Sequence, residues 1–153
     1  MLAASSRSAL LISSSLLLRS RTPCSPLFDI RCMASVSGNI YEADSSAPTV
    51  KLFTKAGCTL CDVAKEVLTR TSEELPHTLE AVDITDADNA QWFEKYKYDI
   101  PVLHIDDIYW AKHRITDDEA REALAAAQEQ RFEAQRGEPD AARLERKKNG
   151  PLR

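Results

Sequence analysis

The sequence lacks an uninterrupted apolar run long enough to cross a membrane, which takes about 20 residues in a helix. It also lacks an internal repeat and a glycine-rich phosphate-binding loop, and it has only 4 glycines in 153 residues. These absences argue against a membrane-spanning protein, a repeat array and a P-loop enzyme. They predict a soluble mature chain with one ordinary domain, provided that its two ends lie outside that domain.

Acidic residues are absent from the first 28 positions, the first of them being Asp29. Arginines spread among serines and short leucine clusters occupy this stretch instead, a composition typical of a mitochondrial transit peptide. We therefore predict a transit peptide over residues 1–33, removed near Arg31, and a mitochondrial protein. The alternatives are an N-terminus without an address and a secretory signal, whose apolar core the serines at 13–15 would interrupt.

Few cysteines remain once this segment is removed. Met33 also reads as a second translation start, which would give a cytosolic form, and in either form the folded domain keeps only Cys58 and Cys61. Residues 34–153 contain 16 Lys and Arg against 23 Asp and Glu, a net charge of −7 with histidine neutral. So acidic a chain does not match a nucleic-acid-binding protein, and we expect neither nucleic acid nor a membrane as a partner.

The first half of the chain predicts a β-α-β unit. Residues 34–48 are small and polar and end in a proline, which is typical of a linker. Runs of strand length follow at 49–54 and 79–84, and a segment with helical periodicity lies between them at 61–71. A crossover of this length predicts that the two strands are parallel.

The second half of the chain follows a different pattern. Residues 87–97 predict a short amphipathic helix, and a proline then opens a strand over residues 101–105, where its missing donor costs least. Residues 108–113 can pair back antiparallel across a short turn. Thr116 and Glu119 form a capping box that starts a last helix.

The order of elements is therefore β-α-β-α-β-β-α. It predicts an α/β fold with a central four-stranded mixed sheet flanked by helices. We place this domain at residues 49–130 and predict a helix extension and a basic tail over residues 131–153. The simplest interpretation of the tail is a solvated chain end.

Cys58 and Cys61 lie at the junction between the first strand and the first helix. A thiol must become a thiolate before it attacks a disulfide, and the start of a helix lowers the pKa of a thiol through unpaired backbone amides and the helix dipole. Lys55 adds a positive charge nearby. The spacing permits an intramolecular disulfide and places Cys61 where it can resolve a mixed disulfide formed at Cys58. We expect Cys61 to be the more buried thiol.

A CxxC pair has two other interpretations, which are two buried thiols or half of a zinc site. Zinc takes four ligands, usually from a second CxxC or from closely spaced histidines. The remaining candidates, His77, His104 and His113, are widely separated in the sequence. The β-α-β context favours the redox interpretation, and we expect no bound metal.

Residues 55–65 (KAGCTLCDVAK) resemble the glutaredoxin active-site stretch, in which a lysine stands three positions before the first cysteine and an Ala-Lys pair follows the second. Residues 99–102 (DIPV) resemble the segment of thioredoxin-fold proteins in which a cis-proline faces the CxxC. Over residues 49–127 the chain thus resembles a small eukaryotic glutaredoxin-like group. This resemblance implies the thioredoxin/glutaredoxin fold.

The resemblance also implies a thiol-disulfide oxidoreductase that reduces protein or glutathione mixed disulfides, an electron-transport role in cell redox homeostasis. It implies that Cys58 is the nucleophile, that Cys61 is the resolving cysteine and that Lys55 contacts a glutathione carboxylate. Ile100 would be the backbone partner of a bound peptide or glutathione, and Pro101 the cis-proline. Glutathione is then a co-substrate, the partners are disulfide-containing or glutathionylated proteins, and we expect a monomer.

Two departures from the family pattern affect glutathione binding. The family's Gly-Gly pair after the last hairpin strand is absent from residues 111–116 (AKHRIT), and its Pro-Tyr between the cysteines is replaced by Thr59-Leu60. Lys112 or Arg114 can supply a substitute charge. Two alternative functions stay open: a glutathione-dependent module that binds an iron-sulfur cluster across a homodimer, and a thioredoxin-fold adaptor with little turnover.

Overall fold

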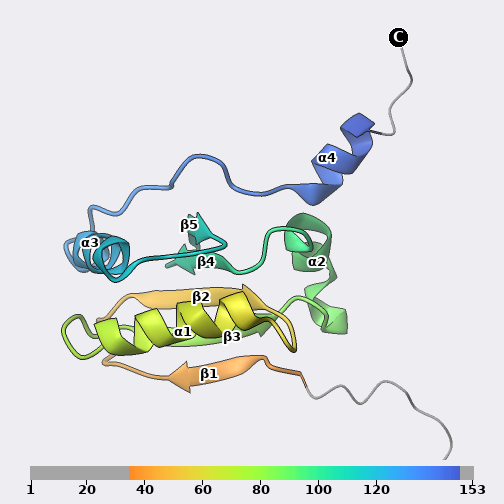
Figure 1. Cartoon of the computed structure of the whole chain (residues 1–153). Helices are drawn as coiled ribbons and strands as arrows, with labels where there is room; N and C mark the ends of the chain where they lie inside the picture. Colours follow the sequence, from red (N-terminus) through yellow and green to blue (C-terminus); the bar gives the residue numbers. More distant parts are fainter. Residues whose placement is uncertain (1–34, 149–153) are drawn as a thin grey trace, which may run out of the picture. The chain divides into compact units, whose positions relative to one another are not determined.

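The computed structural model describes residues 35–148, which form a five-stranded mixed sheet with helices on both faces (Figure 1). The strands are β1 (Gly38–Tyr41), β2 (Thr49–Thr54), β3 (Thr78–Asp83), β4 (Val102–Ile105) and β5 (Ile108–Lys112). The helices are α1 (Thr59–Thr71), the 3-10 turn η1 (Ala87–Asn89), α2 (Ala90–Tyr96), α3 (Asp117–Gln128) and α4 (Ala141–Lys148). No helix within residues 35–148 is long and apolar enough to span a membrane. The predicted transit peptide, residues 1–33, lies outside the described residues.

The order of strands in the sheet is β1-β3-β2-β4-β5. Strands β2 and β3 are parallel, with Val50 opposite Leu79, as the sequence predicts, and every other pair of neighbours is antiparallel. Asp106 and Asp107 join β4 to β5 with φ values of 48° and 69°. Positive φ at both central residues matches the twist of a tight hairpin, so the short turn is also as predicted. The α/β class and the thioredoxin-type arrangement are confirmed.

Strand β1 is a correction to the sequence-based prediction, which assigned residues 34–48 to a linker and expected four strands. Its side chains are mostly exposed and show no apolar alternation, so the segment carries little strand signal of its own. The segment becomes a strand because it pairs with the edge of β3. Just before β1, the Val36 backbone N–H donates to the Asp83 carboxylate at 3.2 Å, and the Ser37 hydroxyl donates to Asp86 at 2.6 Å. These carboxylates hold the segment against the sheet.

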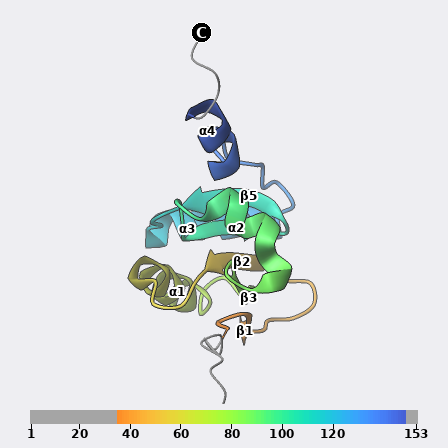
Figure 2. The same ribbon diagram turned by 90° about the vertical axis from the view of Figure 1, so that its right-hand side faces the viewer.

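The two faces of the sheet carry separate apolar clusters, because successive side chains of a strand point to opposite faces. Val50 and Leu52 of β2 pack with residues of α1 and α3 on one face, whereas Phe53 packs with Tyr96 of α2 on the other. Figure 2 shows α1 and α3 on one side of the sheet and η1 and α2 toward the other. The larger cluster lies under α1 and α3 and comprises Val50, Leu52, Ala64, Val67, Leu68, Leu79, Leu103, Ile105, Trp110, Ile115, Ala120, Ala123 and Leu124.

The helix boundaries follow local chemistry. Thr116 accepts a hydrogen bond from the Glu119 backbone N–H at 3.2 Å, and Glu119 accepts one from the Thr116 backbone N–H at 2.8 Å, so the predicted capping box of α3 is confirmed. The predicted helix over residues 87–97 is shorter and divided into η1 and α2. Its large side chains differ in burial, since Tyr96 is fully buried and Phe93 is 39% exposed.

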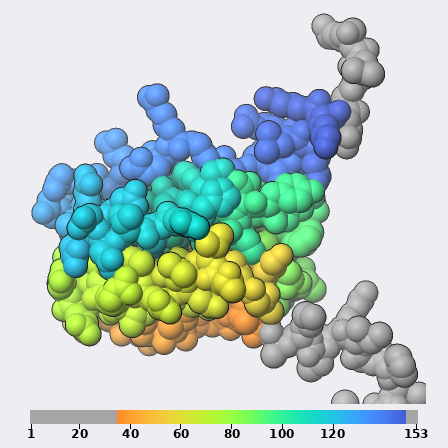
Figure 3. Space-filling model, in the orientation of Figure 1, coloured from red at the N-terminus to blue at the C-terminus, as the bar shows by residue number. Residues whose placement is uncertain are grey.

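The predicted helix extension after residue 131 is wrong. Helix α3 ends at Gln128, and Gln130 adopts a positive φ of 56° that turns the chain out of the helix. Residues 129–140 then cross the surface beside β5 (Figure 3), where the Gln135 backbone N–H donates to the Tyr109 carbonyl at 3.1 Å. The tail forms a separate helix, α4, which packs against α2. Docking of the tail against α2 makes it part of the folded domain.

Candidate functional site

The CxxC motif lies where the carboxyl end of β2 turns into α1. The turn is closed by a hydrogen bond from the Cys58 backbone N–H to the Lys55 carbonyl at 3.3 Å. Gly57 adopts a φ of +74° in this turn, a conformation that glycine adopts without steric cost. Cys58 has extended backbone angles (φ −84°, ψ 96°) and is the N-cap of α1. The predicted position of Cys58, between the first strand and the first helix of the β-α-β unit, is therefore confirmed.

Cys58 and Cys61 form a disulfide bond with their Cα atoms 5.3 Å apart. Cys61 lies one helical turn into α1 and is 0% exposed, whereas Cys58 is half-buried. The predicted pairing and the predicted order of burial are therefore confirmed. An attacking partner reaches the sulfur of Cys58 from outside, and it cannot reach the sulfur of Cys61 in this state.

The sulfur of Cys58 occupies the position of a helix-capping acceptor. The Cys61 backbone N–H donates to Cys58 Sγ at 3.3 Å. A hydrogen bond to a capping acceptor is stronger when the acceptor carries a negative charge, and the helix dipole favours the same charge. A helix start of this kind favours a thiolate over a thiol, and attack on a disulfide requires the thiolate, so we expect Cys58 to be the attacking sulfur in the reduced protein.

The Ile100–Pro101 peptide bond is cis, as expected from the resemblance. It lies at the same end of the sheet as the CxxC, because Val102 pairs with Phe53 near the carboxyl end of β2. The His113 backbone N–H donates to the Pro101 carbonyl at 2.7 Å, which fixes the start of β4 against the end of β5. The structure thus brings Pro101 and the motif to one end of the sheet. Their roles in substrate binding stay predictions.

Lys55 and Ile100 flank this end of the sheet from two different loops. Lys55 is exposed, and its ammonium forms no ion pair with any residue of the described part of the chain. Ile100 is half-buried against the cluster formed with α2. The proposed substrate contacts of Lys55 and Ile100 stay predictions.

Asp99 is a residue of this region that sequence reasoning missed. Its carboxylate accepts a hydrogen bond from Lys112 Nζ at 2.6 Å and lies 3.4 Å from His113 Nε2, and its side chain is only 15% exposed. Lys112, which the sequence offered as a substitute glutathione contact, is therefore already engaged. Arg114, the other candidate, is exposed. The one feature of the sequence that pointed to Asp99 was its position directly before Ile100 and Pro101.

The three histidines do not gather into one site. His77 is buried at the far end of β3, where its Nε2 lies 2.6 Å from the Tyr41 hydroxyl, and burial lowers its pKa. His104 is buried beneath α2, and His113 is exposed. Across residues 35–148, no group of three or more His, Cys, Asp or Glu side chains is arranged to hold a metal ion.

A polar network under α2 was also missed from the sequence. The Tyr96 hydroxyl donates to Glu138 at 2.7 Å and lies 3.0 Å from His104 Nε2. Which of Tyr96 and His104 donates in this second contact depends on the tautomer of the imidazole. Burial lowers the pKa of His104, which keeps the ring neutral. The network joins the C-terminal segment to the helix that leads into Asp99 and Pro101.

Comparisons with known proteins agree with these observations. A family model described as "Glutaredoxin-like domain (DUF836)" matches residues 49–128. The "Glutaredoxin-like protein YDR286C homolog" of Dictyostelium discoideum is 41% identical over 73 residues, which cover 45% of this chain and 68% of that relative. The matched range ends at the last residue of α3, so the segment that carries Glu138 and α4 lies outside it.

Proposed function

Because the chain belongs to the glutaredoxin-like family, we propose that it is a thiol-disulfide oxidoreductase that reduces disulfides through Cys58 and Cys61. The Cys58 thiolate attacks one sulfur of a disulfide, and the other sulfur leaves as a thiolate that takes up a proton. The Cys61 thiolate then attacks Cys58 Sγ and releases the second substrate thiol. Two electrons pass to the substrate, and an external thiol reductant resets the disulfide of Cys58 and Cys61.

The observation that carries this proposal is the unequal setting of the two sulfurs. Cys58 is half-buried, caps α1 and accepts a hydrogen bond from the Cys61 backbone N–H, so it suits the attacking role. Cys61 is 0% exposed and bonded to Cys58, so it suits intramolecular resolution. Exchange rates depend on the thiolate fraction of the attacking thiol and on access to it, and both conditions favour Cys58.

The substrates that we propose are glutathione mixed disulfides and disulfides of proteins, with glutathione as the co-substrate. Lys55 is exposed beside the CxxC turn and is suited to contact a substrate carboxylate. Ile100, held by the cis bond before Pro101, presents its backbone to an extended peptide or to glutathione. Lys55 and the exposed Arg114 are the cations that we propose for glutathione binding, because Lys112 is engaged with Asp99.

The proposed exchange is tested with the reduced chain and a peptide in mixed disulfide with glutathione. We expect Cys58→Ser to abolish release of glutathione, because serine cannot form the mixed disulfide. We expect Cys61→Ser to keep a first attack and to accumulate the mixed disulfide at Cys58, which mass spectrometry detects as an added adduct. Equal release of glutathione by wild type and Cys58→Ser would contradict the proposal.

We also propose that the protein acts in mitochondria, after removal of residues 1–33, and that it acts as a monomer. The support is the arginine-rich and serine-rich composition of the first 28 residues, which contain no Asp or Glu. Fusing residues 1–33 to a fluorescent protein tests the address. Fluorescence spread through the cytosol, with no fluorescence in mitochondria, would contradict it.

A further inference from the structure

The C-terminal segment, residues 138–148, turns two of its three acidic side chains toward α2 and the residues that follow it. Glu138 accepts a hydrogen bond from the Tyr96 hydroxyl at 2.7 Å. Glu145 accepts hydrogen bonds from Lys97 Nζ at 3.1 Å and from the Tyr98 hydroxyl at 2.7 Å. These contacts place α4 in a defined position on the domain.

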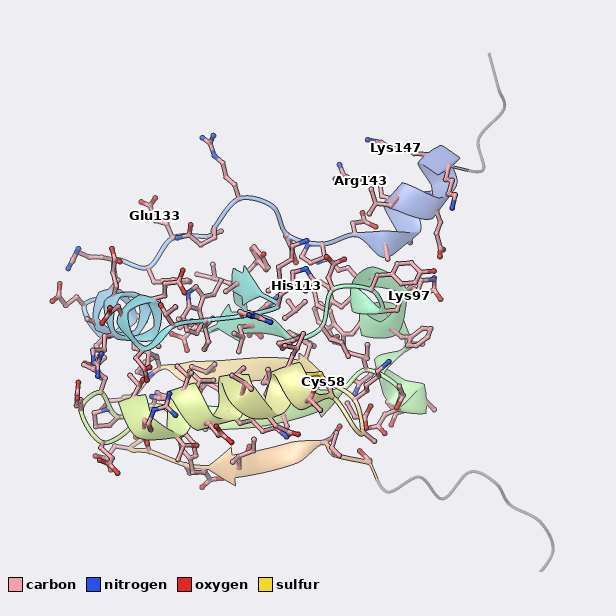
Figure 4. The ribbon with its side chains drawn as sticks, viewed as in Figure 1. Cys58, Lys97, His113, Glu133, Arg143 and Lys147 are labelled. Carbon is pink, nitrogen blue, oxygen red and sulfur yellow. A yellow bond between two sulfur atoms is a disulfide. The ribbon has the colours of Figure 1, made fainter. Side chains whose placement is uncertain are left out.

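Two of the four basic side chains of α4 point the other way. In Figure 4, Arg143 and Lys147 extend from α4 away from α2, while Lys97 lies beneath it. Arg143, Arg146, Lys147 and Lys148 are all exposed. Among the described residues, their only ion pair within 4.0 Å joins Arg143 to Asp140 at 3.9 Å. The helix therefore presents four cations to solvent with little neutralisation.

This positive charge stands against an acidic domain. Residues 35–140 contain 11 Lys and Arg against 22 Asp and Glu, a net charge of −11, whereas residues 141–148 contain 4 Lys and Arg against 1 Glu, a net charge of +3. Such an uneven distribution orients a charged partner before contact, because long-range attraction and repulsion act on different parts of the surface. An acidic partner is repelled by the body of the domain and attracted to α4.

Helix α4 lies at the end of the sheet where Cys58 is found. The parallel strands β2 and β3 both run toward this end. Strand β2 leads into α1, which begins beside Cys58, and β3 leads into η1 and α2. Because α4 packs on α2, it lies toward this end of the sheet, as Figures 1 and 2 show. A partner bound to α4 is thus held at the same end of the domain as the CxxC turn.

We propose that α4 is a docking site for an acidic segment of the protein whose disulfide Cys58 attacks. The choice of a disulfide-bearing partner rests on the proposed oxidoreductase function, and the attraction of an acidic segment to α4 does not. Charge complementarity favours this occupant over a basic protein, which the body of the domain would draw to other surfaces. Docking at α4 adds a substrate preference to that of the residues around Cys58.

The test uses the full chain and two peptides that each carry one cysteine in mixed disulfide with a coloured thiol. One peptide has four glutamates beside the cysteine and the other has four glutamines. The α4 variant carries Arg143→Gln, Arg146→Gln, Lys147→Gln and Lys148→Gln. The control carries Arg70→Gln, Arg121→Gln, Arg131→Gln and Arg136→Gln, and so loses the same charge from other surfaces. Single-turnover release of the coloured thiol by the reduced chain gives a second-order rate constant for each combination of protein and peptide.

We expect wild type to react about ten-fold faster with the acidic peptide than with the neutral one at low salt, the lower end of typical electrostatic steering. The ratio should approach one at about 1 M salt, where the screening length falls to about 3 Å. The α4 variant should show a ratio near one at low salt, and the control should keep most of the preference. A wild-type ratio near one, or an equal loss in the control, would overturn the proposal.

Binding is measured separately by fluorescence anisotropy, with the oxidised chain and labelled peptides that carry serine in place of cysteine. If neither mixed disulfide is reduced, the oxidoreductase function fails, and the anisotropy still decides whether α4 holds the acidic peptide. Sedimentation of the chain alone tests a different occupant. A dimer of the wild type that the α4 variant does not form would assign the basic face to a second copy and overturn the docking proposal.

Discussion

Replacing Glu138 with alanine should destabilise the domain by removing the acceptor that joins residues 129–140 to α2. The Tyr96 hydroxyl donates to Glu138, and Tyr96 is 0% exposed, so the variant leaves a buried donor without its charged acceptor. Loss of a hydrogen bond to a charged group costs about 1.5–3 kcal/mol. The ion pair of Glu138 with Lys95 adds about 0–1 kcal/mol, because both side chains are more than a third exposed.

The expected loss is about 2 kcal/mol in the free energy of unfolding, taken low in this range because water reaches part of Glu138. For a domain of this size, that corresponds to a decrease of about 8 °C in Tm. Urea unfolding followed by tryptophan fluorescence measures the first quantity, and calorimetry measures the second. Glu133→Ala is the matched control, because Glu133 is exposed in the same segment and points away from the domain in Figure 4.

The pH dependence of this difference gives an independent check. Burial by itself raises the pKa of Glu138, but hydrogen bonds from Lys95 and Tyr96 outweigh it, and the pKa is lowered in the folded protein. A carboxyl group with a lowered pKa stabilises the fold above its unfolded pKa of about 4.3, and this contribution is lost as the pH falls through the folded value. The difference between wild type and Glu138→Ala should therefore be full at pH 7 and should shrink as the pH falls below about 4.3 and through the folded pKa of Glu138. A loss equal to that of Glu133→Ala, or one that does not change with pH, would refute the role of this network.

Three further predictions concern titration, substrate choice and the N-terminal strand. Burial lowers the pKa of His77 and His104, so the unfolded state takes up protons first, and stability should fall by at most about 1.4 kcal/mol per histidine for each pH unit below about 6.5. Urea unfolding at pH 7.5 and 5.5 checks this, and His104→Gln should show a smaller decrease than wild type. Asp99→Asn releases Lys112 and should lower the KM for a glutathione mixed disulfide by about three-fold, from one exposed charge contact of about 0.2–1 kcal/mol, with kcat unchanged; a raised KM would contradict it. Asp83→Asn weakens the acceptor for the backbone before β1, and hydrogen exchange of the β1 amides should become faster while that of β4 stays unchanged.

Local patterns determined much of the fold and the central part of the site. The CxxC at a strand-to-helix junction, the capping box of Thr116 and Glu119, and the parallel pairing of β2 with β3 each depend on residues close in the sequence or on a short crossover. The identity of Pro101 as a cis-proline came from a resemblance, because about 95% of X-Pro bonds in folded proteins are trans. The first three features could be predicted because the residues that cause them lie close in the sequence or are joined by a short crossover.

The remaining features depend on contacts between residues far apart in the sequence. Strand β1 has no apolar alternation and forms because the edge of β3 is available to pair with it. Lys112 carries a charge that looks free in the sequence, but Asp99 from another loop binds it. Neither partner can be inferred from the local sequence alone.

The C-terminal tail shows the difference most directly. By itself the sequence determined that the tail is basic and polar, which is typical of a solvated chain end. Only the tertiary structure decided that Glu138 and Glu145 face α2 while the arginines and lysines face solvent. The physical reason is that Tyr96 and Lys97 supply partners for carboxylates and none for cations, so the same segment is anchored on one side and charged on the other.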